Sequence, residues 1–306
     1  GDIRRSLMQK ADMETKLHQV MFAEPTTANI NDDSNKILQL MKEKDFTAIP
    51  VLDSESKIVD LVTMKNLIED SKLENTVFLM AGGFGKRLGE LTNDTPKPLL
   101  NIGDKPIILT IIEQLIKHGF KKFIISSHYK SKMLIDYFGN GESLGIDIKH
   151  IYEDTPLGTA GSLGLIQDLN IKKPLVVMNS DLLTALNFKN LLRFHERSNV
   201  QATICAQEYV HQIPYGKLIV EDAKLKSIKE KPKEKSFINA GIYVIEPTVL
   251  QSIKKNKRLD MPDLLTSIIK KNGEVAVFPI HEYWLDIGGI EDFQKGQKEY
   301  YGNFKS

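Results

Sequence analysis

The chain has 306 residues, of which 41 are Lys or Arg and 40 are Asp or Glu, so its formal net charge at pH 7 is only +1. This balance gives no electrostatic reason to expect nucleic acid or an anionic membrane surface as a partner. No apolar run approaches the roughly 20 residues that a membrane-spanning helix needs, and no signal peptide is apparent, so we expect a cytoplasmic protein. With 41% hydrophobic residues, the length predicts about two domains with cores of their own.

Residues 15–72 show the pattern of a small α/β module. An amphipathic helix is predicted around residues 37–41, where apolar side chains recur at helical spacing. Strands are predicted at residues 48–52 and 57–63, because both runs are rich in apolar and β-branched residues and are bounded by turn residues. A second helix is expected through residues 67–68.

This order of elements resembles a CBS domain, named after cystathionine β-synthase. Residues 46–53 are similar to the strand that precedes the family's turn, and residues 62–67 are similar to its closing motif. CBS repeats that bind adenine nucleotides usually hold the ribose with an Asp where this repeat has Asn66. Gly1-Asp2-Ile3 resembles the same motif in a preceding repeat, with Asp2 in the ribose position.

The resemblance implies a division of the chain into four segments. We expect the remnant of a preceding CBS repeat at residues 1–14, a CBS repeat at 15–72, a linker at 73–75 and a larger domain at 76–306. Because CBS repeats work in pairs, most of the first repeat is expected upstream of residue 1, and a regulatory nucleotide would need the intact pair. A purely structural role and an oligomerising role, which would make the protein a homo-oligomer, are the alternatives.

The stretch from residue 79 to residue 100 has the features of a loop that binds phosphate. A short buried strand is predicted at residues 77–80. Gly82, Gly83 and Gly85 then allow a sharp turn that brings backbone N–H groups close to an anion.

Three cations accompany these glycines, namely Lys86, Arg87 and Lys97. Prolines on both sides of Lys97 predict that this lysine lies on a stiff extended segment, since each proline fixes its own φ and restricts the residue before it. The run matches neither a P-loop nor a dinucleotide fingerprint, because the required glycine and lysine spacings are absent. A strongly anionic ligand is the natural inference.

From residue 76 onward, apolar strands alternate with helices, which is typical of an α/β fold with a mainly parallel sheet covered on both faces. Helices are predicted at residues 107–118 and around 133–138, and strands at residues 122–127, 146–152, 174–181, 215–220 and 237–245. A further helix begins after Leu157, where Gly158 and Gly161 would let backbone N–H groups face a ligand.

Two isolated carboxylates are candidate cation ligands. Asp181 ends the clearest buried strand of the chain, and ligands of open α/β sheets lie at the carboxyl ends of strands. A helix-capping role is the alternative, but Leu182 and Leu183 continue a strand-like pattern. Asp286 lies far away in the sequence, so spacing alone does not show whether the two aspartates are neighbours.

Together these motifs resemble the sugar-1-phosphate nucleotidyltransferases, also called nucleotide-sugar pyrophosphorylases, over residues 76–306. The family's glycine loop, Pro-Lys-Pro, Glu-Lys-Pro, Asn-Ala-Gly and Trp-x-Asp-x-Gly motifs are met at residues 82–88, 96–98, 230–232, 239–241 and 284–288. The loop departs from the family pattern at Lys86 and Glu90, where Thr and Pro are commoner. The implied fold is an α/β, Rossmann-like mixed and mainly parallel sheet of the glycosyltransferase-A-like kind.

The resemblance implies roles for individual residues. The nucleotide would be bound by Ala81, Gly82, Gly83, Gly85, Arg87, Lys97, Gly158, Thr159 and Asp181. The sugar phosphate would be bound by Gly216, Glu230, Lys231 and Asn239, and Mg²⁺ would be held by Asp181 and Asp286. The catalytic residues would be Arg87, Lys97, Asp181 and Lys231. No general base is implied, because the attacking phosphate oxygen is already ionised.

The joining of CBS repeats to such a domain is similar to the glucosamine-1-phosphate guanylyltransferases of bacterial legionaminic acid synthesis. That resemblance implies GTP and glucosamine 1-phosphate as substrates and GDP-glucosamine and pyrophosphate as products. A mannose-1-phosphate guanylyltransferase, which shares Leu-Gly-Thr-Ala-Gly at residues 157–161, and another uridylyl- or thymidylyltransferase are alternatives. A non-catalytic subunit that senses nucleotides is a rival of a different class, although the charged catalytic positions are all present.

Overall fold

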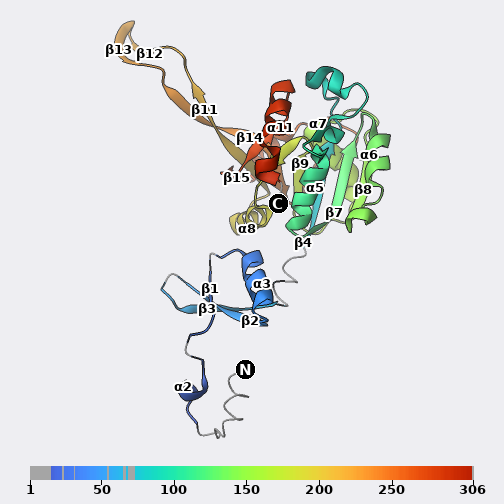
Figure 1. Ribbon diagram of the computed structural model, residues 1–306. Helices are drawn as coiled ribbons and strands as arrows, with labels where there is room; N and C mark the ends of the chain where they lie inside the picture. Colours follow the sequence, from blue (N-terminus) through green and yellow to red (C-terminus); the bar gives the residue numbers. More distant parts are fainter. Residues whose placement is uncertain are drawn as a thin grey trace. The chain divides into compact units, whose positions relative to one another are not determined.

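The computed structural model describes residues 15–22, 24–30, 32–53, 55–64, 67 and 73–304. The chain forms two compact units, which meet in the sequence between Lys72 and Leu73. The two units are described separately below, and Figure 1 labels their elements.

In the residues that the structure describes, the N-terminal unit forms a three-stranded sheet and a ten-residue helix. After the short α2 (Leu17–Val20), the chain forms β1 (Ala28–Asn29), α3 (Ser34–Glu43), β2 (Ala48–Leu52) and β3 (Ile58–Thr63). The sheet order is β1-β2-β3, with β1 parallel to β2 and β2 antiparallel to β3. The first helix and the two strands predicted from the sequence are therefore present. The second predicted helix, through residues 67–68, extends outside the described residues.

A small core holds this unit together. Ile37 and Met41 lie one helical turn apart on α3 and are buried, and so are Ile49 and Val51, which alternate along β2. They pack with one another in a single hydrophobic cluster. The two expected ribose-binding positions, Asp2 and Asn66, lie outside the described residues.

The larger unit is built on a seven-stranded sheet in the order β15-β11-β14-β9-β4-β7-β8. These strands are β4 (Leu73–Ala81), β7 (Phe120–Ser127), β8 (Asp147–Tyr152), β9 (Leu175–Asn179), β11 (Ala202–Gln212), β14 (Lys233–Ile245) and β15 (Val275–Ile280). Every pairing is parallel except the two that β14 makes, with β11 and with β9. The predicted mixed, mainly parallel sheet is confirmed.

Helices cover both faces of this sheet because its strands are apolar on both sides. One face packs against α5 (Ile107–Lys117), α6 (Ser131–Phe138), α8 (Phe188–Ser198) and α11 (Ile290–Phe304). The other packs against α7 (Gly158–Gly161), the 3₁₀ segment η4 (Ser162–Leu169), α9 (Pro247–Leu250) and α10 (Met261–Lys270). Along β4, Val77 and Leu79 point into the first layer and Phe78 points into the second.

The start of β4 differs from the sequence prediction. Residues 73–75 were expected to form a linker, but β4 begins at Leu73. Leu73 donates its backbone N–H to the carbonyl of Gly119 over 3.0 Å, and the buried Asn75 side chain donates to the carbonyl of Pro174 over 2.8 Å. These two contacts with segments remote in the sequence extend the strand, and local composition does not reveal them.

Shorter elements complete the unit. They are η1 (Lys86–Thr92), η2 (Lys97–Leu99), β5 (Asn101–Ile102), β6 (Lys105–Pro106), η3 (Glu142–Leu144), β10 (Leu182–Thr184), β12 (Lys217–Glu221), β13 (Lys224–Lys229) and β16 (Trp284–Asp286). The strand predicted at residues 215–220 begins two residues later, as β12. Within the part of the chain that the structure describes, no helix combines the length and the apolarity needed to cross a bilayer.

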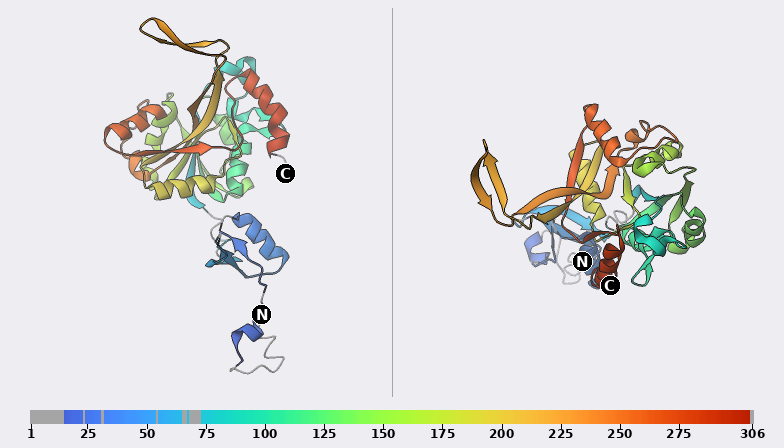
Figure 2. Two further views of the ribbon diagram at one scale, coloured as in Figure 1. Left: turned by 90° about the vertical axis from the view of Figure 1, so that its left-hand side faces the viewer. Right: turned by 90° about the horizontal axis from the view of Figure 1, so that it is seen from above.

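A two-stranded arm projects from the sheet, as all three views in Figures 1 and 2 show. We use the name arm for residues 207–238. Its base is the continuation of β11 and β14, which pair from Gln207↔Ile238 to Gln212↔Lys233, and its tip is the antiparallel hairpin β12–β13.

The packing of Phe120 gives a test of the core. Its side chain is fully buried in the layer of α5 and α8, where its ring meets that of Phe188 edge to face at a centroid distance of 6.3 Å. We expect Phe120→Ala to lower the free energy of unfolding by about 3–5 kcal/mol, because it leaves a cavity. Phe120→Leu, the matched control, is expected to cost less than about 1.5 kcal/mol.

Urea unfolding followed by fluorescence of Trp284 measures both changes, since the chain's only tryptophan packs against the same core. Equal losses in the two variants would show that Phe120 does not fill this core as described.

Candidate active site

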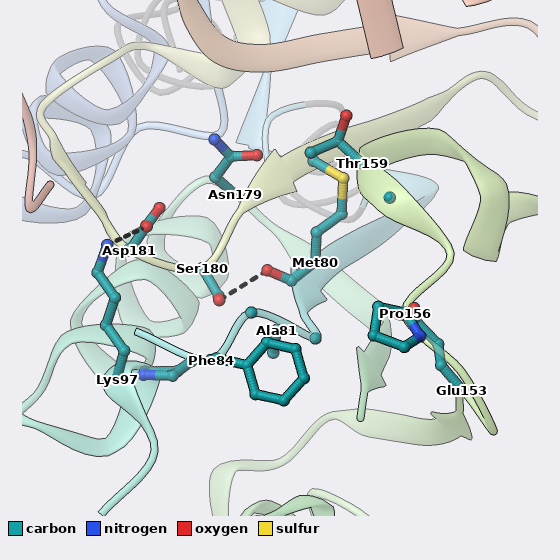
Figure 3. Close-up of a pocket in the computed structure, with 14 residues that line it drawn as sticks. Met80, Ala81, Phe84, Lys97, Glu153, Pro156, Thr159, Asn179, Ser180 and Asp181 are labelled. Carbon is teal, nitrogen blue, oxygen red and sulfur yellow. Dashed lines mark hydrogen bonds and ion pairs between the residues drawn. The ribbon is translucent and has the colours of Figure 1, made fainter. Parts of the chain in front are cut away.

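A cavity of about 260 Å³ lies at the carboxyl ends of β4 and β9, the edge at which open α/β sheets bind ligands. Figure 3 shows Lys97 and Asp181 on one side of it and Glu153 and Pro156 on the other. The expected nucleotide-binding residues that line this cavity are Ala81, Gly82, Gly83, Lys97, Gly158, Thr159 and Asp181. The expected residues Gly85 and Arg87 are not part of its lining.

The glycine loop begins where β4 ends, at Ala81. Gly85 adopts a φ of 68°, and a Cβ on it would lie 2.8 Å from the Thr92 side chain, so the turn requires glycine. The amides of Gly82 and Gly83 make no hydrogen bond with any described part of the chain. These two amides are therefore available to a ligand in the cavity.

Lys97 is held differently from the sequence prediction. Pro96 is extended, with φ −66° and ψ 143°, but Lys97 begins the single 3₁₀ turn η2 and does not lie on an extended segment. The turn forms because the amide of Leu100 donates to the carbonyl of Lys97 over 3.1 Å. Lys97 is 7% exposed, and its ammonium group forms an ion pair with Asp181.

The pairing of β10 with β16 brings the two predicted metal ligands together. Leu182 is opposite Asp286 in this antiparallel pair, and the amide of Ile287 donates to the carbonyl of Asp181 over 3.0 Å. Oδ1 of Asp181 and Oδ1 of Asp286 are both buried without a hydrogen-bond partner among the described residues. Two buried carboxylate oxygens without donors are acceptors that a bound cation would satisfy.

The pKa of the Asp286 carboxyl reflects both its burial and the charges around it. Burial raises the pKa of the Asp286 carboxyl, and the negative charge of Asp181 raises it further. Lys97 and Arg87 lower the same pKa because their positive charges lie near the carboxyl. Arg87 extends from the glycine loop toward Gly288, where its guanidinium lies 3.4 Å from the position that a Cβ would take.

The donor set at this edge fits Mg²⁺. Magnesium usually binds one or two carboxylates together with substrate phosphates and waters, whereas structural zinc sites need four protein ligands. The described residues contain no group of three or more His, Cys, Asp or Glu side chains placed to hold a metal. Asp181 and Asp286, beside the glycine loop, match the magnesium pattern.

A second cavity of about 400 Å³ adjoins the first, since Thr159 and Asn179 line both. Its lining includes Asn239, which was predicted to bind sugar, and Asp286. Asp260 also lines this cavity and was not anticipated from the sequence.

The Asn-Ala-Gly run shapes this second cavity. Gly241 adopts a φ of 70°, and a Cβ there would lie 2.6 Å from Nδ2 of Asn179. The Asn239 side chain accepts from the amide of Gly241 over 3.0 Å and donates to the Tyr243 hydroxyl over 2.7 Å. Trp284 Nε1 donates to the carbonyl of Ala240 over 2.9 Å, which joins this run to the strand that carries Asp286.

Three of the four backbone amides of α7 are not free for a ligand, which corrects part of the expectation from Gly158 and Gly161. The amides of Ala160 and Gly161 both donate to the carbonyl of Leu259 over 2.9 Å. The amide of Thr159 donates to Oδ1 of Asp260 over 3.1 Å. A segment about 100 residues away in the sequence satisfies these three donors. Of the α7 amides, only that of Gly158, which lines the first cavity, has no partner among the described residues.

Three of the predicted sugar-phosphate ligands lie on the arm and line neither cavity. These are Gly216, Glu230 and Lys231. Between Asn239 and Lys233 the chain is continuous β-strand, which at about 3.3 Å per residue separates the second cavity from the outer arm by roughly 20 Å. The structure thus brings Asn239, but not the other three, to the site.

Glu153 is a site residue that the sequence analysis did not single out. It lines the first cavity and is only 4% exposed. Its Oε1 accepts from the Ser126 hydroxyl over 2.7 Å, and its Oε2 accepts from the amide of Leu157 over 3.0 Å. A Cβ on Gly82 would lie 2.9 Å from Oε1, so this carboxylate lies directly beneath the glycine loop.

Comparison with known proteins agrees with this architecture. Residues 76–302 match the nucleotidyl transferase family, and residues 17–72 match the CBS domain family. A probable mannose-1-phosphate guanylyltransferase 1 of Oryza sativa subsp. japonica is 35% identical over 230 residues, which are 72% of this chain and 63% of that protein. The mannose-1-phosphate guanylyltransferase catalytic subunit beta of Dictyostelium discoideum is 32% identical, over 74% of this chain and 65% of its own.

Solved structures give the same fold. HddC from Yersinia pseudotuberculosis complexed with GMP-PN superimposes with a TM-score of 0.59 at 25% identity and covers 74% of this chain and 99% of its own. A putative glucose-1-phosphate thymidylyltransferase from Bacillus anthracis has 21% identity and a TM-score of 0.59, and the match covers 73% of this chain and 94% of that protein. The chain spans less than two thirds of the length of the two guanylyltransferases above. Because the family match extends over most of its residues, the chain belongs to the nucleotidyl transferase family.

Proposed function

We propose that the protein is a sugar-1-phosphate guanylyltransferase, which forms a GDP-sugar and pyrophosphate from GTP and a sugar 1-phosphate. The observation that carries this proposal is the pair of buried carboxylate oxygens on Asp181 and Asp286, which lack donors and lie beside a glycine loop and a buried lysine. The names of the relatives and the guanine nucleotide analogue in HddC support the choice of GTP.

The reaction joins two highly anionic molecules. An oxygen of the sugar phosphate forms a bond to the α-phosphorus of GTP, the bond from that phosphorus to the bridging oxygen breaks, and its electron pair leaves with pyrophosphate. The attacking oxygen is already ionised, so no side chain has to remove a proton. The demand on the protein is therefore to neutralise charge and to hold the two phosphates in line.

The residues of the first cavity suit this demand. The free amides of Gly82 and Gly83 would hold phosphate oxygens, and Arg87 and Lys97 would balance the charge of the triphosphate and of the transferring group. Asp181 and Asp286 would hold Mg²⁺, which when bound neutralises charge on the phosphates. A phosphate group of the bound substrate would also pair with the Lys97 ammonium in place of the Asp181 carboxylate.

Glu153 supports the choice of guanine. It lies across the cavity from Lys97 and Asp181, where the base would lie if the phosphates occupy the charged end (Figure 3). Guanine presents the adjacent donors N1–H and N2–H₂, which a carboxylate can accept, and each carboxylate oxygen can accept more than the one bond that it has now. Uracil and thymine present a single N–H between two carbonyl oxygens. A carboxylate repels these two oxygens.

The second cavity would take the sugar. For the sugar itself we propose glucosamine 1-phosphate, because Asp260 gives this cavity a carboxylate that an ammonium group can contact. Mannose 1-phosphate is the alternative that the relatives' names favour. Asn239 would contact the sugar directly, whereas Gly216, Glu230 and Lys231 would reach it only if the arm bends toward the cavity.

The CBS unit would add regulation in a longer protein. CBS repeats work in pairs, so the single repeat at residues 17–72 would bind a regulatory nucleotide only together with another repeat. The described core of this unit is formed by its own residues, among them Ile37, Met41 and Ile49. The proposal for the reaction does not use them.

A matrix of GTP, UTP, dTTP and ATP against glucosamine, mannose and glucose 1-phosphates tests the function, with pyrophosphate release in Mg²⁺ as the readout. We expect product with GTP, and the highest kcat/KM with glucosamine 1-phosphate. Product with UTP or dTTP alone would refute the guanylyl assignment and keep the reaction class. No product in any combination would favour a non-catalytic nucleotide sensor.

Substitution of Asp181 tests its role in transfer. We expect Asp181→Asn to fold normally and to lower kcat roughly 100-fold or more, because it removes one of the two carboxylates that would hold Mg²⁺ at the transferring phosphate. Asp154→Asn is the matched control, since Asp154 is an exposed carboxylate one residue after Glu153 and does not line the cavity. Unimpaired pyrophosphate release by Asp181→Asn would remove this residue from the mechanism.

Substitution of Glu153 tests the recognition of guanine. We expect Glu153→Gln to lower kcat/KM for GTP about tenfold or more relative to UTP, because a hydrogen bond to a charged group contributes about 1.5–3 kcal/mol. Ser126→Ala removes one support of the carboxylate but keeps its charge, so it should retain the preference for GTP. An equal loss with both nucleotides in Glu153→Gln would indicate a purely structural carboxylate.

A further inference from the structure

The first cavity contains an aromatic side chain, which the neutralisation of phosphate charge does not require. Among the described residues that line this cavity, Phe84 alone is aromatic, and it is 41% exposed in the glycine loop between Gly83 and Gly85. A loop that binds phosphate uses backbone amides and gives no reason for an exposed ring. Single exposed apolar side chains are common, so the surroundings of the ring decide whether it is placed for a ligand.

Neighbouring side chains hold the Phe84 ring in place. The His128 ring meets it edge to face with 5.6 Å between the ring centroids, and the Tyr129 ring meets it at an interplanar angle of 47° over the same distance. The Lys86 ammonium lies 5.4 Å from the Phe84 centroid, which is within the range of a cation–π attraction. Because these contacts restrict the ring before any ligand binds, a ligand that packs on it has less side-chain entropy to offset.

The two rings that contact Phe84 are themselves fixed by hydrogen bonds. His128 Nδ1–H donates to the backbone carbonyl of Glu153 over 2.7 Å, and a carbonyl can only accept, so Nδ1 carries the hydrogen. The Tyr129 hydroxyl donates to the carbonyl of Thr92 over 3.4 Å. His128 therefore links the exposed ring to the residue whose carboxylate we assign to the recognition of guanine.

The ring lies along the path that a bound nucleotide would take. Figure 3 shows Phe84 between Lys97 and Glu153 in that view, and all three residues line the cavity. Phosphates at Lys97 and a base at Glu153 would bring the nucleotide past this ring. A flat, partly apolar group is the chemistry that an exposed phenyl ring recognises, and a nucleobase is such a group.

We propose that Phe84 is the surface on which the base of the bound nucleotide stacks. The proposal rests on the proposed function, because it places a nucleotide in the first cavity. Glu153 would recognise the hydrogen-bonding edge of the base, whereas Phe84 would hold its face. Stacking tolerates any base but is stronger for the larger purines, so Phe84 would also favour GTP over UTP.

Calorimetric binding without sugar phosphate tests the stacking with GTP, UTP and ribose 5-triphosphate, which lacks only the base. We expect Phe84→Ala to weaken GTP binding about fivefold or more, UTP binding less, and ribose 5-triphosphate binding by less than about twofold. Phe84→Tyr keeps a ring and should bind GTP about as the unchanged chain does. Tyr137→Ala is the matched control, since Tyr137 is an exposed aromatic residue of α6 that lines neither cavity.

Phe84→Trp adds a readout that a merely structural role would not change. A base stacked on the new indole should quench its fluorescence, so we expect GTP to quench Phe84→Trp more than the unchanged chain, in which Trp284 supplies the background. Ribose 5-triphosphate should not cause this extra quenching. Far-UV circular dichroism checks that each variant is folded.

The outcomes separate the stacking from the reaction. Unchanged GTP binding by Phe84→Ala, or an equal loss for GTP and ribose 5-triphosphate, would overturn the stacking and leave the guanylyltransferase assignment intact. An unchanged chain that binds GTP no better than ribose 5-triphosphate would overturn it as well. Base-dependent binding through Phe84 without any product in the substrate matrix would refute the reaction and support the stacking.

Discussion

The candidate active site depends most on the balance of charge around Asp181. Its carboxylate lies at the carboxyl edge of the sheet between the Lys97 ammonium, with which it pairs, and the buried carboxyl of Asp286, whose pKa it raises. Two carboxylates can share this edge only because cations from the glycine loop and from η2 face them. Three elements place these charged groups: the pairing of β10 with β16, the turn after Pro96 and the glycine loop.

Much of this site could be predicted from the sequence, because its signals are local. A glycine-rich turn after an apolar strand, a lysine between prolines and an aspartate at the end of a buried strand each follow from rules that act over a few residues. The proximity of Asp286 to Asp181 could not be predicted, since it depends on a strand pair that joins segments about 100 residues apart in the sequence. Glu153 could not be predicted as a site residue, because two consecutive acidic residues in a loop are typical of a solvent-exposed segment.

The wrong predictions share a physical reason, which is competition from tertiary contacts. The amides after Gly158 seemed free for a ligand, yet the backbone at Leu259 and the Asp260 side chain accept their hydrogen bonds. Residues 73–75 seemed to be a linker, yet Gly119 and Pro174 bind them into the sheet. The strands of the arm were recognisable, but the distance between Lys231 and the cavities was not, because strand propensity does not encode where a ribbon leaves its sheet.

The contact between Gly82 and Glu153 has a consequence for the residues that the glycine loop tolerates. A Cβ at residue 82 would lie 2.9 Å from Oε1 of Glu153. A larger residue would therefore push the carboxylate away from the Ser126 hydroxyl and the Leu157 amide, which donate hydrogen bonds to it. Glycine at residue 82 thus preserves both hydrogen bonds and leaves the loop in direct contact with the buried carboxylate.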